Sequence, residues 1–394
     1  MSKKISIILL IFLSVILGLW IWSAAVPKNS IILGGSTSVN PFMQKLTKEY
    51  HDETKVDFVY NSTGSQAGVS GVEKDMYSAG FISKDINEGT LTKGNTFFSD
   101  FKPKSQYADS CKTQGSIKEY DFDKVEEPHS GESRDKSYVA LEFAIDAIGI
   151  IYNSPSYWGQ EIKYGENKVL TLNDLMNFDL ENGSGKKMIS DIYSGSKNWE
   201  DIAYELIIQN KSLDEATKND FINLINSQAK QKIVTYTRED GSGTRSAFSD
   251  LTGVKNMPNS NVVNSNGSMI ENMQRAPSVG YVSNAFLKQL TTDGPINLAG
   301  IDDYKLPIGE EEKPFEFIDN EWVEIEGKNV DEFIRDTYTF KRPFITIFNT
   351  HSDKYDELMK LFDFINSEKS DNVFKSEGLV KNMKYKTIIG GTYA

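Results

Sequence analysis

Short apolar runs alternate with amphipathic stretches along most of the chain, and small polar turns separate them. The first apolar runs occupy 31–33, 56–60 and 79–82, and each is followed by a turn that contains glycine, serine or threonine. Apolar residues at helical spacing over 41–50 and a second stretch ending at Val72 predict helices between these runs. The repeated order of strand, polar turn and helix is typical of an open α/β sheet, in which ligands bind at the carboxyl ends of the strands.

The same pattern returns after a long interruption. Residues 87–136 are polar, charged and rich in turns, and we expect an insertion or extended loop there, which can be partly disordered. Beyond it the pattern predicts buried strand over 139–153, strands over 279–282 and 343–348, helices over 170–175, 198–208, 266–274 and 355–365, and a β-hairpin within 315–326.

One turn is more informative than the others. The β-branched run Ile233-Val234-Thr235-Tyr236 leads into Arg238-Glu239-Asp240-Gly241-Ser242-Gly243-Thr244-Arg245, and a helical pattern follows. A strand–turn–helix of this kind directs unpaired amides and the positive end of the helix dipole at one point. Ser242, Thr244 and Arg238 add hydroxyl and guanidinium donors, so the expected guest is an oxyanion. An ordinary capped turn gives a similar local pattern, but it does not need two arginines.

Three further small polar turns follow apolar strands. They contain Ser36-Thr37-Ser38, Thr63-Gly64-Ser65 and Ser83. Each could simply cap its own helix. Four such turns in one chain, one of them flanked by arginines, fit a shared anion site better than four independent caps.

Composition and charge narrow the function. The chain has 394 residues, 39% of them hydrophobic, and a formal net charge of −13, which argues against nucleic acid and anionic membrane surfaces as partners. A small anion remains compatible, because a desolvated cluster of donors outweighs surface charge beyond the Debye length of about 8 Å. Cys111 is the only cysteine and the three histidines are far apart, so we expect no disulfide, no metal site and no cofactor.

The N-terminus has the pattern of a membrane segment. Lys3 and Lys4 precede an apolar run over 5–22, which as a helix spans about 27 Å, close to the thickness of the hydrocarbon core. We expect a single uncleaved anchor in the cell membrane with the body on the extracytoplasmic side. The alternative is a secretory signal peptide cleaved near Ser23-Ala24-Ala25.

The sequence resembles the phosphate-binding proteins of ABC-type phosphate importers over nearly the whole chain after the anchor. The most specific motif is the arginine followed three places later by Gly241-Ser242-Gly243-Thr244. The further matching motifs are Gly34-Gly35-Ser36-Thr37-Ser38, Gly64-Ser65-Gln66-Ala67-Gly68-Val69, Gly80-Phe81-Ile82-Ser83, Asp191-Ile192-Tyr193-Ser194-Gly195, Asn266-Gly267-Ser268 and Arg342-Pro343-Phe344.

This resemblance implies an α/β, two-lobed fold of the periplasmic-binding-protein type II class, with a mixed sheet flanked by helices in each lobe. Residues 1–29 would form the anchor or signal and linker, and 138–337 the second lobe. The first lobe would combine 30–137 and 338–394. Two hinge crossings are expected, near Tyr138-Val139 and within 337–343.

The resemblance also implies the site residues. The first lobe would bind phosphate through Ser36, Thr37, Ser38, Ser65 and Ser83, and the second through Arg238, Asp240, Ser242, Gly243 and Thr244. Asp240 would mainly hold Arg238 by a salt bridge. Some family members have an aspartate where this chain has Ser83, and that carboxylate accepts the proton of bound phosphate, so the preference for phosphate over sulfate stays open here.

The implied function is extracytoplasmic, membrane-tethered binding of inorganic phosphate and its delivery to an ABC permease, by a monomer that is not an enzyme. A phosphate-sensing or adhesive surface protein on the same fold is the main alternative, with 87–136 carrying the partner. A phosphatase with Ser242 as nucleophile is disfavoured, because no histidine is near in sequence and the nucleophile-elbow spacing is absent.

Overall fold

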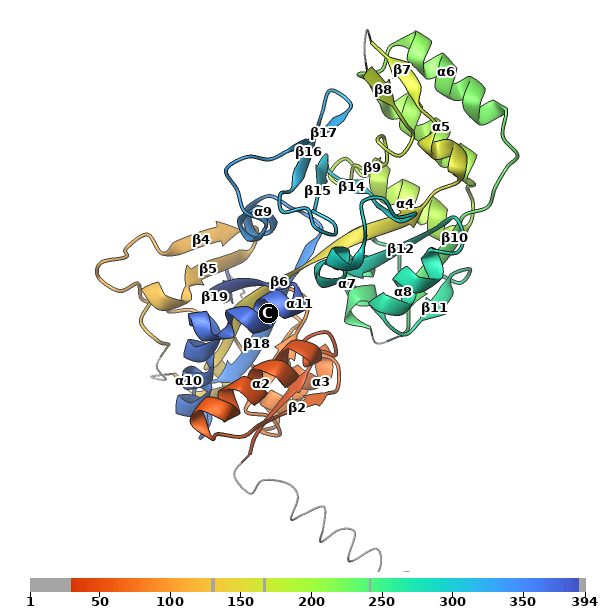
Figure 1. Cartoon of the computed structure of the whole chain (residues 1–394). Helices are drawn as coiled ribbons and strands as arrows, with labels where there is room; N and C mark the ends of the chain where they lie inside the picture. The colour runs from red at the N-terminus through yellow and green to blue at the C-terminus, as the bar shows by residue number, and fades with distance from the viewer. Residues whose placement is uncertain (1–29, 129–131, 166–167, 241, 390–394) are drawn as a thin grey trace, which may run out of the picture.

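The computed structural model describes residues 30–128, 132–165, 168–240 and 242–389. Two lobes lie side by side and long strands run between them (Figure 1). The predicted N-terminal anchor lies outside the described residues. Within the described part, none of the helices has the length and apolarity that a membrane crossing requires.

The first lobe begins with three parallel strands. β1 (Ile31–Gly35) lies between β2 (Phe58–Ser62) and β3 (Ala79–Ile82) and pairs in parallel with both. Helix α2 (Asn40–Thr54) follows β1, and α3 (Ser65–Glu73) follows β2. Both helices therefore begin at the carboxyl edge of this sheet, as the alternation of strand, polar turn and helix predicts.

Three antiparallel strands complete the first lobe. β18 (Lys341–Asn349) pairs with β3 and with β6 (Tyr138–Asn153), and β19 (Val380–Ile388) pairs with β6. Helices α10 (Tyr355–Asn366) and α11 (Asp371–Glu377) pack on this part of the sheet. The lobe is thus a mixed sheet flanked by helices.

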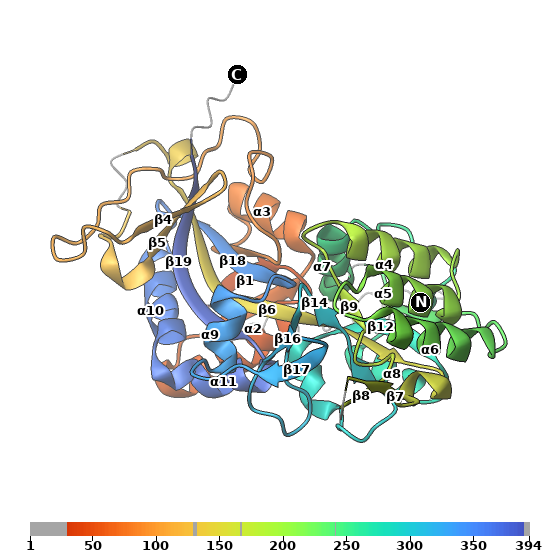
Figure 2. The same cartoon turned by 90° about the horizontal axis from the view of Figure 1, so that it is seen from above.

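The second lobe repeats the mixed arrangement. β10 (Val234–Arg238) pairs in parallel with β11 (Asn261–Val263) and β12 (Ser278–Ser283), and β12 pairs antiparallel with β6. Helix α7 (Gly243–Thr252) follows β10, and α8 (Asn266–Met273) follows β11. Figures 1 and 2 place α7 on the side of the second lobe that faces the first.

Further elements surround this core of the second lobe. They are β7 (Ile162–Tyr164), β8 (Lys168–Leu170), β9 (Asn177–Phe178), α4 (Ser184–Ser194), α5 (Trp199–Gln209), α6 (Glu215–Asn226), β13 (Asn297–Leu298), β14 (Gly300–Ile301), β15 (Tyr304–Lys305), β16 (Phe315–Ile318) and β17 (Glu321–Glu324). Helix α9 (Val330–Asp336) contacts β19 of the first lobe and β6. β16 and β17 form the hairpin that the sequence predicts.

Two strands connect the lobes. Residues 138–147 of β6 pair with β18, and residues 148–153 pair with β12. The first crossing therefore lies further along β6 than the expected position at Tyr138-Val139. The second lies at the start of β18, within the expected range 337–343. The prediction of a two-lobed α/β fold of this class, with two crossings, is confirmed.

The segment 87–136 is more ordered than expected. It contains β4 (Cys111–Gln114) and β5 (Ile117–Asp121), and β5 extends the first-lobe sheet by pairing with β19. The buried Phe101 stacks on Tyr385 of β19, with 5.2 Å between ring centroids. The buried aromatic residues of 87–136 are irregularly spaced, so they form no periodic pattern in the sequence.

The prediction of a helix over 170–175 is wrong. Leu170 ends β8, and a turn follows in which the carboxylate of Asp174 accepts hydrogen bonds from the amide and hydroxyl of Thr171, at 2.8 and 2.7 Å. This local side-chain bonding competes with helix formation. The other helices predicted with it correspond to α5, α8 and α10.

Candidate functional site

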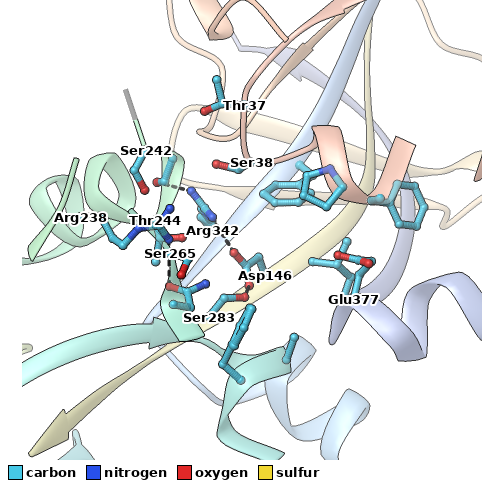
Figure 3. Close-up of a pocket in the computed structure, with 18 of the residues that line it drawn as sticks. Thr37, Ser38, Asp146, Arg238, Ser242, Thr244, Ser265, Ser283, Arg342 and Glu377 are labelled. Atoms are coloured by element: carbon cyan, nitrogen blue, oxygen red, sulfur yellow. Dashed lines mark hydrogen bonds and ion pairs between the residues drawn. The ribbon is translucent and has the colours of Figure 1, made fainter. Parts of the chain in front are cut away.

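Two adjoining chambers lie between the lobes. We call the first the Arg238 chamber, a cavity of about 260 Å³ that Figure 3 shows in close-up. We call the second the Ser65 chamber, a more open space of about 510 Å³. Thr37 and Gly243 line both chambers, so the two spaces meet where the loop before α2 faces the start of α7.

All ten predicted site residues lie in this cleft. The Arg238 chamber is lined by Thr37, Ser38, Arg238, Ser242, Gly243 and Thr244. The Ser65 chamber is lined by Ser36, Thr37, Ser65, Ser83, Asp240 and Gly243. The structure thus brings the turns of both lobes together, and it divides their donors between two spaces.

The first-lobe donors depend on a backbone that only glycine adopts. Gly35 has a φ of 141°, and a Cβ there would overlap the carbonyl of Phe81. The chain then turns, and the Ser36 amide donates to the same carbonyl at 2.8 Å. This turn carries Ser36 and Ser38 to the edge of the sheet, where α2 begins.

A hydroxyl relay links the first-lobe turns. The Ser36 hydroxyl donates to Ser83 Oγ at 2.9 Å, and the Ser83 amide donates to Ser65 Oγ at 3.4 Å. Because the Ser83 hydroxyl accepts from Ser36, its own proton is left to donate toward the cleft. Ser38 Oγ is buried and has no hydrogen-bond partner among the described residues, a state that a bound oxyanion would relieve.

The second-lobe donors lie at the start of α7. Ser242 is the N-cap, and its hydroxyl oxygen accepts from the Arg245 amide at 3.4 Å. The first-turn amides of an α-helix have no partner within the helix, and the dipole makes that end attractive to anions. The side chains of Ser242 and Thr244 are both buried at this end.

The prediction of a salt bridge between Asp240 and Arg238 is wrong. Arg238 donates instead to both carboxylate oxygens of Glu239, at 2.9 and 3.0 Å, and to the Asn266 side chain at 3.1 Å. Asp240 pairs with Arg245 at 2.7 Å, and its side chain is 95% exposed. The longer Glu239 side chain reaches back over the neighbouring guanidinium, whereas Asp240 points to the Ser65 chamber.

This pairing affects the acidity of Glu239. Burial acts to raise the pKa of the Glu239 carboxyl, but the hydrogen bonds and charge of Arg238 outweigh it and hold the pKa below its ordinary value. The Arg238–Glu239 pair is therefore charged at neutral pH, and Arg238 is held in one orientation at the chamber wall.

Sequence reasoning gave no site role to the charged pair of Arg342 and Asp146, which lines the Arg238 chamber. Arg342 donates to Asp146 Oδ2 from Nε at 3.0 Å and from Nη2 at 2.6 Å, and both side chains are almost completely buried. Ser283 donates to Asp146 Oδ1 at 2.6 Å. Asp146 is the one carboxylate inside the apolar stretch Ala144–Ile151. A lone carboxylate in an apolar strand is the sequence feature from which its role could have been predicted.

The Ser65 chamber carries three cations that were not among the predicted site residues. Lys84 comes from the first lobe, and Arg245 and Lys255 come from the second. Neither lysine has an ion pair within the described part of the chain, whereas Arg245 pairs with Asp240. Across the same described ranges, there is no group of three or more histidine, cysteine, aspartate or glutamate residues that could hold a metal ion.

A family model described as a PBP (periplasmic binding protein) superfamily domain matches residues 23–369. The chain belongs to the PBP superfamily. This is a family of non-enzymatic substrate-binding proteins. The prediction that the protein is not an enzyme is therefore confirmed. No curated protein matches the sequence significantly.

Two solved structures have the same fold. An ABC-type phosphate transport receptor from Vibrio cholerae is 17% identical, with 89% of this chain and 99% of that chain covered and a TM-score of 0.50. A possible phosphate binding protein from Planctomyces limnophilus is 13% identical, with 89% and 92% covered and a TM-score of 0.50. At these identities the likeness concerns the fold alone.

Proposed function

We propose that this protein binds inorganic phosphate on the extracytoplasmic side of the membrane and delivers it to an ABC permease. The observation that carries the proposal is the convergence of donor turns from both lobes where Ser38 faces Gly243. Helices α2, α3 and α7 all begin at this cleft, and their first turns provide amides and dipoles suited to an oxyanion.

Charge within the cleft supports an anionic guest. Arg238 is fixed at one wall, and in the Ser65 chamber the cations Lys84, Arg245 and Lys255 outnumber the carboxylates Asp240 and Asp250. A desolvated phosphate gains about 1.5–3 kcal/mol net from each charge-assisted hydrogen bond, so a cage of several donors supports micromolar or tighter binding. The net charge of −13 does not oppose this, because exposed charges at a distance are screened.

Two further observations favour phosphate among the oxyanions. The motif of arginine followed by Gly241-Ser242-Gly243-Thr244 is the one that the phosphate-binding proteins of ABC importers carry. The structures from Vibrio cholerae and Planctomyces limnophilus, which share the fold, are named as a phosphate transport receptor and a possible phosphate binding protein. We infer that binding closes the two lobes on the ligand by rotation at the β6 and β18 crossings.

Calorimetry tests the ligand. The full chain in detergent is titrated with phosphate and with sulfate, and we expect phosphate to bind with a dissociation constant of about 1 μM or lower. A Ser38→Ala variant should bind phosphate more weakly, because its buried hydroxyl is one of the proposed donors. Absence of heat with both anions, in protein that unfolds cooperatively, would refute the proposal.

Tethering and delivery need separate tests. N-terminal sequencing of protein from membranes should find the segment over 5–22 still present, since we propose an uncleaved anchor. Its loss with cleavage near Ser23-Ala24-Ala25 would identify a secreted form instead. Phosphate-dependent co-purification with permease subunits tests delivery, and phosphate binding without any permease association would leave a sensing role.

A further inference from the structure

A buried ionic cluster lies where the two strands cross between the lobes. Arg342 on β18 and Asp146 on β6 are direct cross-strand partners. Their side chains are only 5% and 2% exposed, and Asp146 also accepts from Ser283 at the end of β12. One carboxylate therefore joins both crossing strands to a strand of the second lobe.

Arg342 also reaches the proposed ligand loop. Its Nη1 donates to the carbonyl of Gly243, the first residue of α7 (Figure 3). β18 pairs with first-lobe strands, whereas Gly243 belongs to the second lobe. This hydrogen bond therefore links the second crossing to the donor turn of the second lobe, and we expect rotation at the crossings to change it.

The cluster is not explained by stability. A buried ion pair gains little over apolar residues of similar volume, because both charges lose their hydration. A cation beside the first turn of a helix is also unfavourable with respect to the helix dipole. A role that apolar residues could not perform accounts better for the guanidinium at this position.

We propose that Arg342 is a positioning residue that couples lobe closure to the orientation of the α7 donor turn. By holding the Gly243 carbonyl, Arg342 fixes the orientation of the first turn of α7 and of its unpaired amides. It does so only when the lobes are together, so the donor turn takes its binding geometry as the cleft closes. This deepens the proposed phosphate-binding function and rests on it.

Three variants separate coupling from stability. Arg342→Lys keeps a cation beside Asp146 but lacks the fork that also reaches Gly243. The double variant Arg342→Met/Asp146→Leu replaces the pair with apolar side chains of similar size. Tyr338→Phe is the control, since it removes a buried hydrogen bond from Tyr338 to the Ile148 carbonyl (2.9 Å) at the same crossing without touching α7.

Four quantities are measured on each full-length protein. Two of them are the melting temperature and the phosphate dissociation constant. The other two are measured without ligand: the radius of gyration by small-angle scattering, and amide hydrogen exchange over 242–247. For Arg342→Lys and the double variant we expect faster exchange over 242–247, a larger radius and a dissociation constant raised by about tenfold or more. For the double variant these changes should persist at a melting temperature near that of the wild type. Tyr338→Phe should lower the melting temperature and leave the other quantities unchanged.

Two outcomes would overturn the proposal. One is wild-type exchange over 242–247 in Arg342→Lys and in the double variant. The other is a loss of affinity in Tyr338→Phe as large as that in Arg342→Lys. If the wild type itself binds no phosphate, the phosphate proposal fails, while the ligand-free exchange and scattering still decide whether Arg342 orients the donor turn.

Discussion

Gly243→Ala tests whether the lobes must approach as closely as the structure shows. A Cβ at Gly243 would overlap Ser38 Oγ and would lie 2.6 Å from Ser38 Cβ and 3.0 Å from Arg342 Nη1. Rotation of the serine hydroxyl relieves only the first of these contacts. The two carbon atoms still need about 0.8 Å more to reach the 3.4 Å at which ordinary contact begins.

That displacement gives a magnitude for the loss of binding. An added separation of this size between the lobes lengthens the hydrogen bonds that one lobe makes to a ligand held by the other. If two charge-assisted bonds of about 1.5 kcal/mol each are lost, the affinity falls by about 3 kcal/mol, roughly a hundredfold. The free energy of unfolding should not decrease, because alanine is favoured over glycine in a helix by about 0.5–1 kcal/mol.

The assay compares Gly243→Ala with a matched control. Gly267 lies in the first turn of α8, and the nearest atom to a Cβ there is Ser265 Oγ at 4.0 Å, so Gly267→Ala should change neither closure nor affinity. Phosphate titration gives the dissociation constants, and small-angle scattering with saturating phosphate reports closure. The reasoning is refuted if Gly243→Ala closes fully and binds phosphate within about twofold of the wild type, a free-energy change of less than about 0.5 kcal/mol.

Three further predictions concern selectivity, pH dependence and packing. Ser83→Asp should shift the ratio of phosphate to sulfate affinity toward phosphate by about tenfold or more, since a buried carboxylate facing sulfate has no proton to accept. Titration with both anions checks this, and an equal change in affinity for both anions would contradict it. Burial lowers the pKa of Lys305 to about 7, so from pH 7 to about 10 the unfolded chain binds more protons and wild-type stability rises with pH. Lys305→Met should therefore be more stable than the wild type near pH 7, by a few kcal/mol in urea unfolding, and this advantage should shrink toward pH 10; a difference independent of pH would count against it. Phe101→Ala should reduce the free energy of unfolding by about 3 kcal/mol, because the ring packs on Tyr385; an unchanged value would mean that 87–136 is a peripheral insertion after all.

The sequence allowed the fold and the location of the site to be predicted for the same physical reason. Strand, polar turn and helix repeat at regular spacing, and parallel strands put their following turns on one edge of a sheet. The turns at Ser36, Ser65 and Ser83 meet there in the structure, as β1 lies between β2 and β3. Local patterns were enough because each turn is set by residues close together in the chain.

The contacts within the site could not be predicted in this way. Glu239 and Asp240 are adjacent acids, and only the path of the turn decides which of them reaches Arg238. Asp146 and Arg342 are 196 positions apart, so their pairing depends on the register between β6 and β18. The segment 87–136 was misjudged for a similar reason, since its aromatic residues pack against distant strands without forming a repeat of their own.

We expect the two chambers to contribute unequally to anion binding. In the Arg238 chamber each cation already has a carboxylate partner, Glu239 for Arg238 and Asp146 for Arg342, so its contribution to an anion comes mainly from fixed dipoles and hydroxyl groups. In the Ser65 chamber Lys84 is without an ion pair among the described residues, and the space is wider. Long-range attraction should therefore depend on the Ser65 chamber, and the final orientation on the Arg238 chamber. Added salt should slow phosphate association more than it speeds release, because exposed charges are screened and buried dipoles are not.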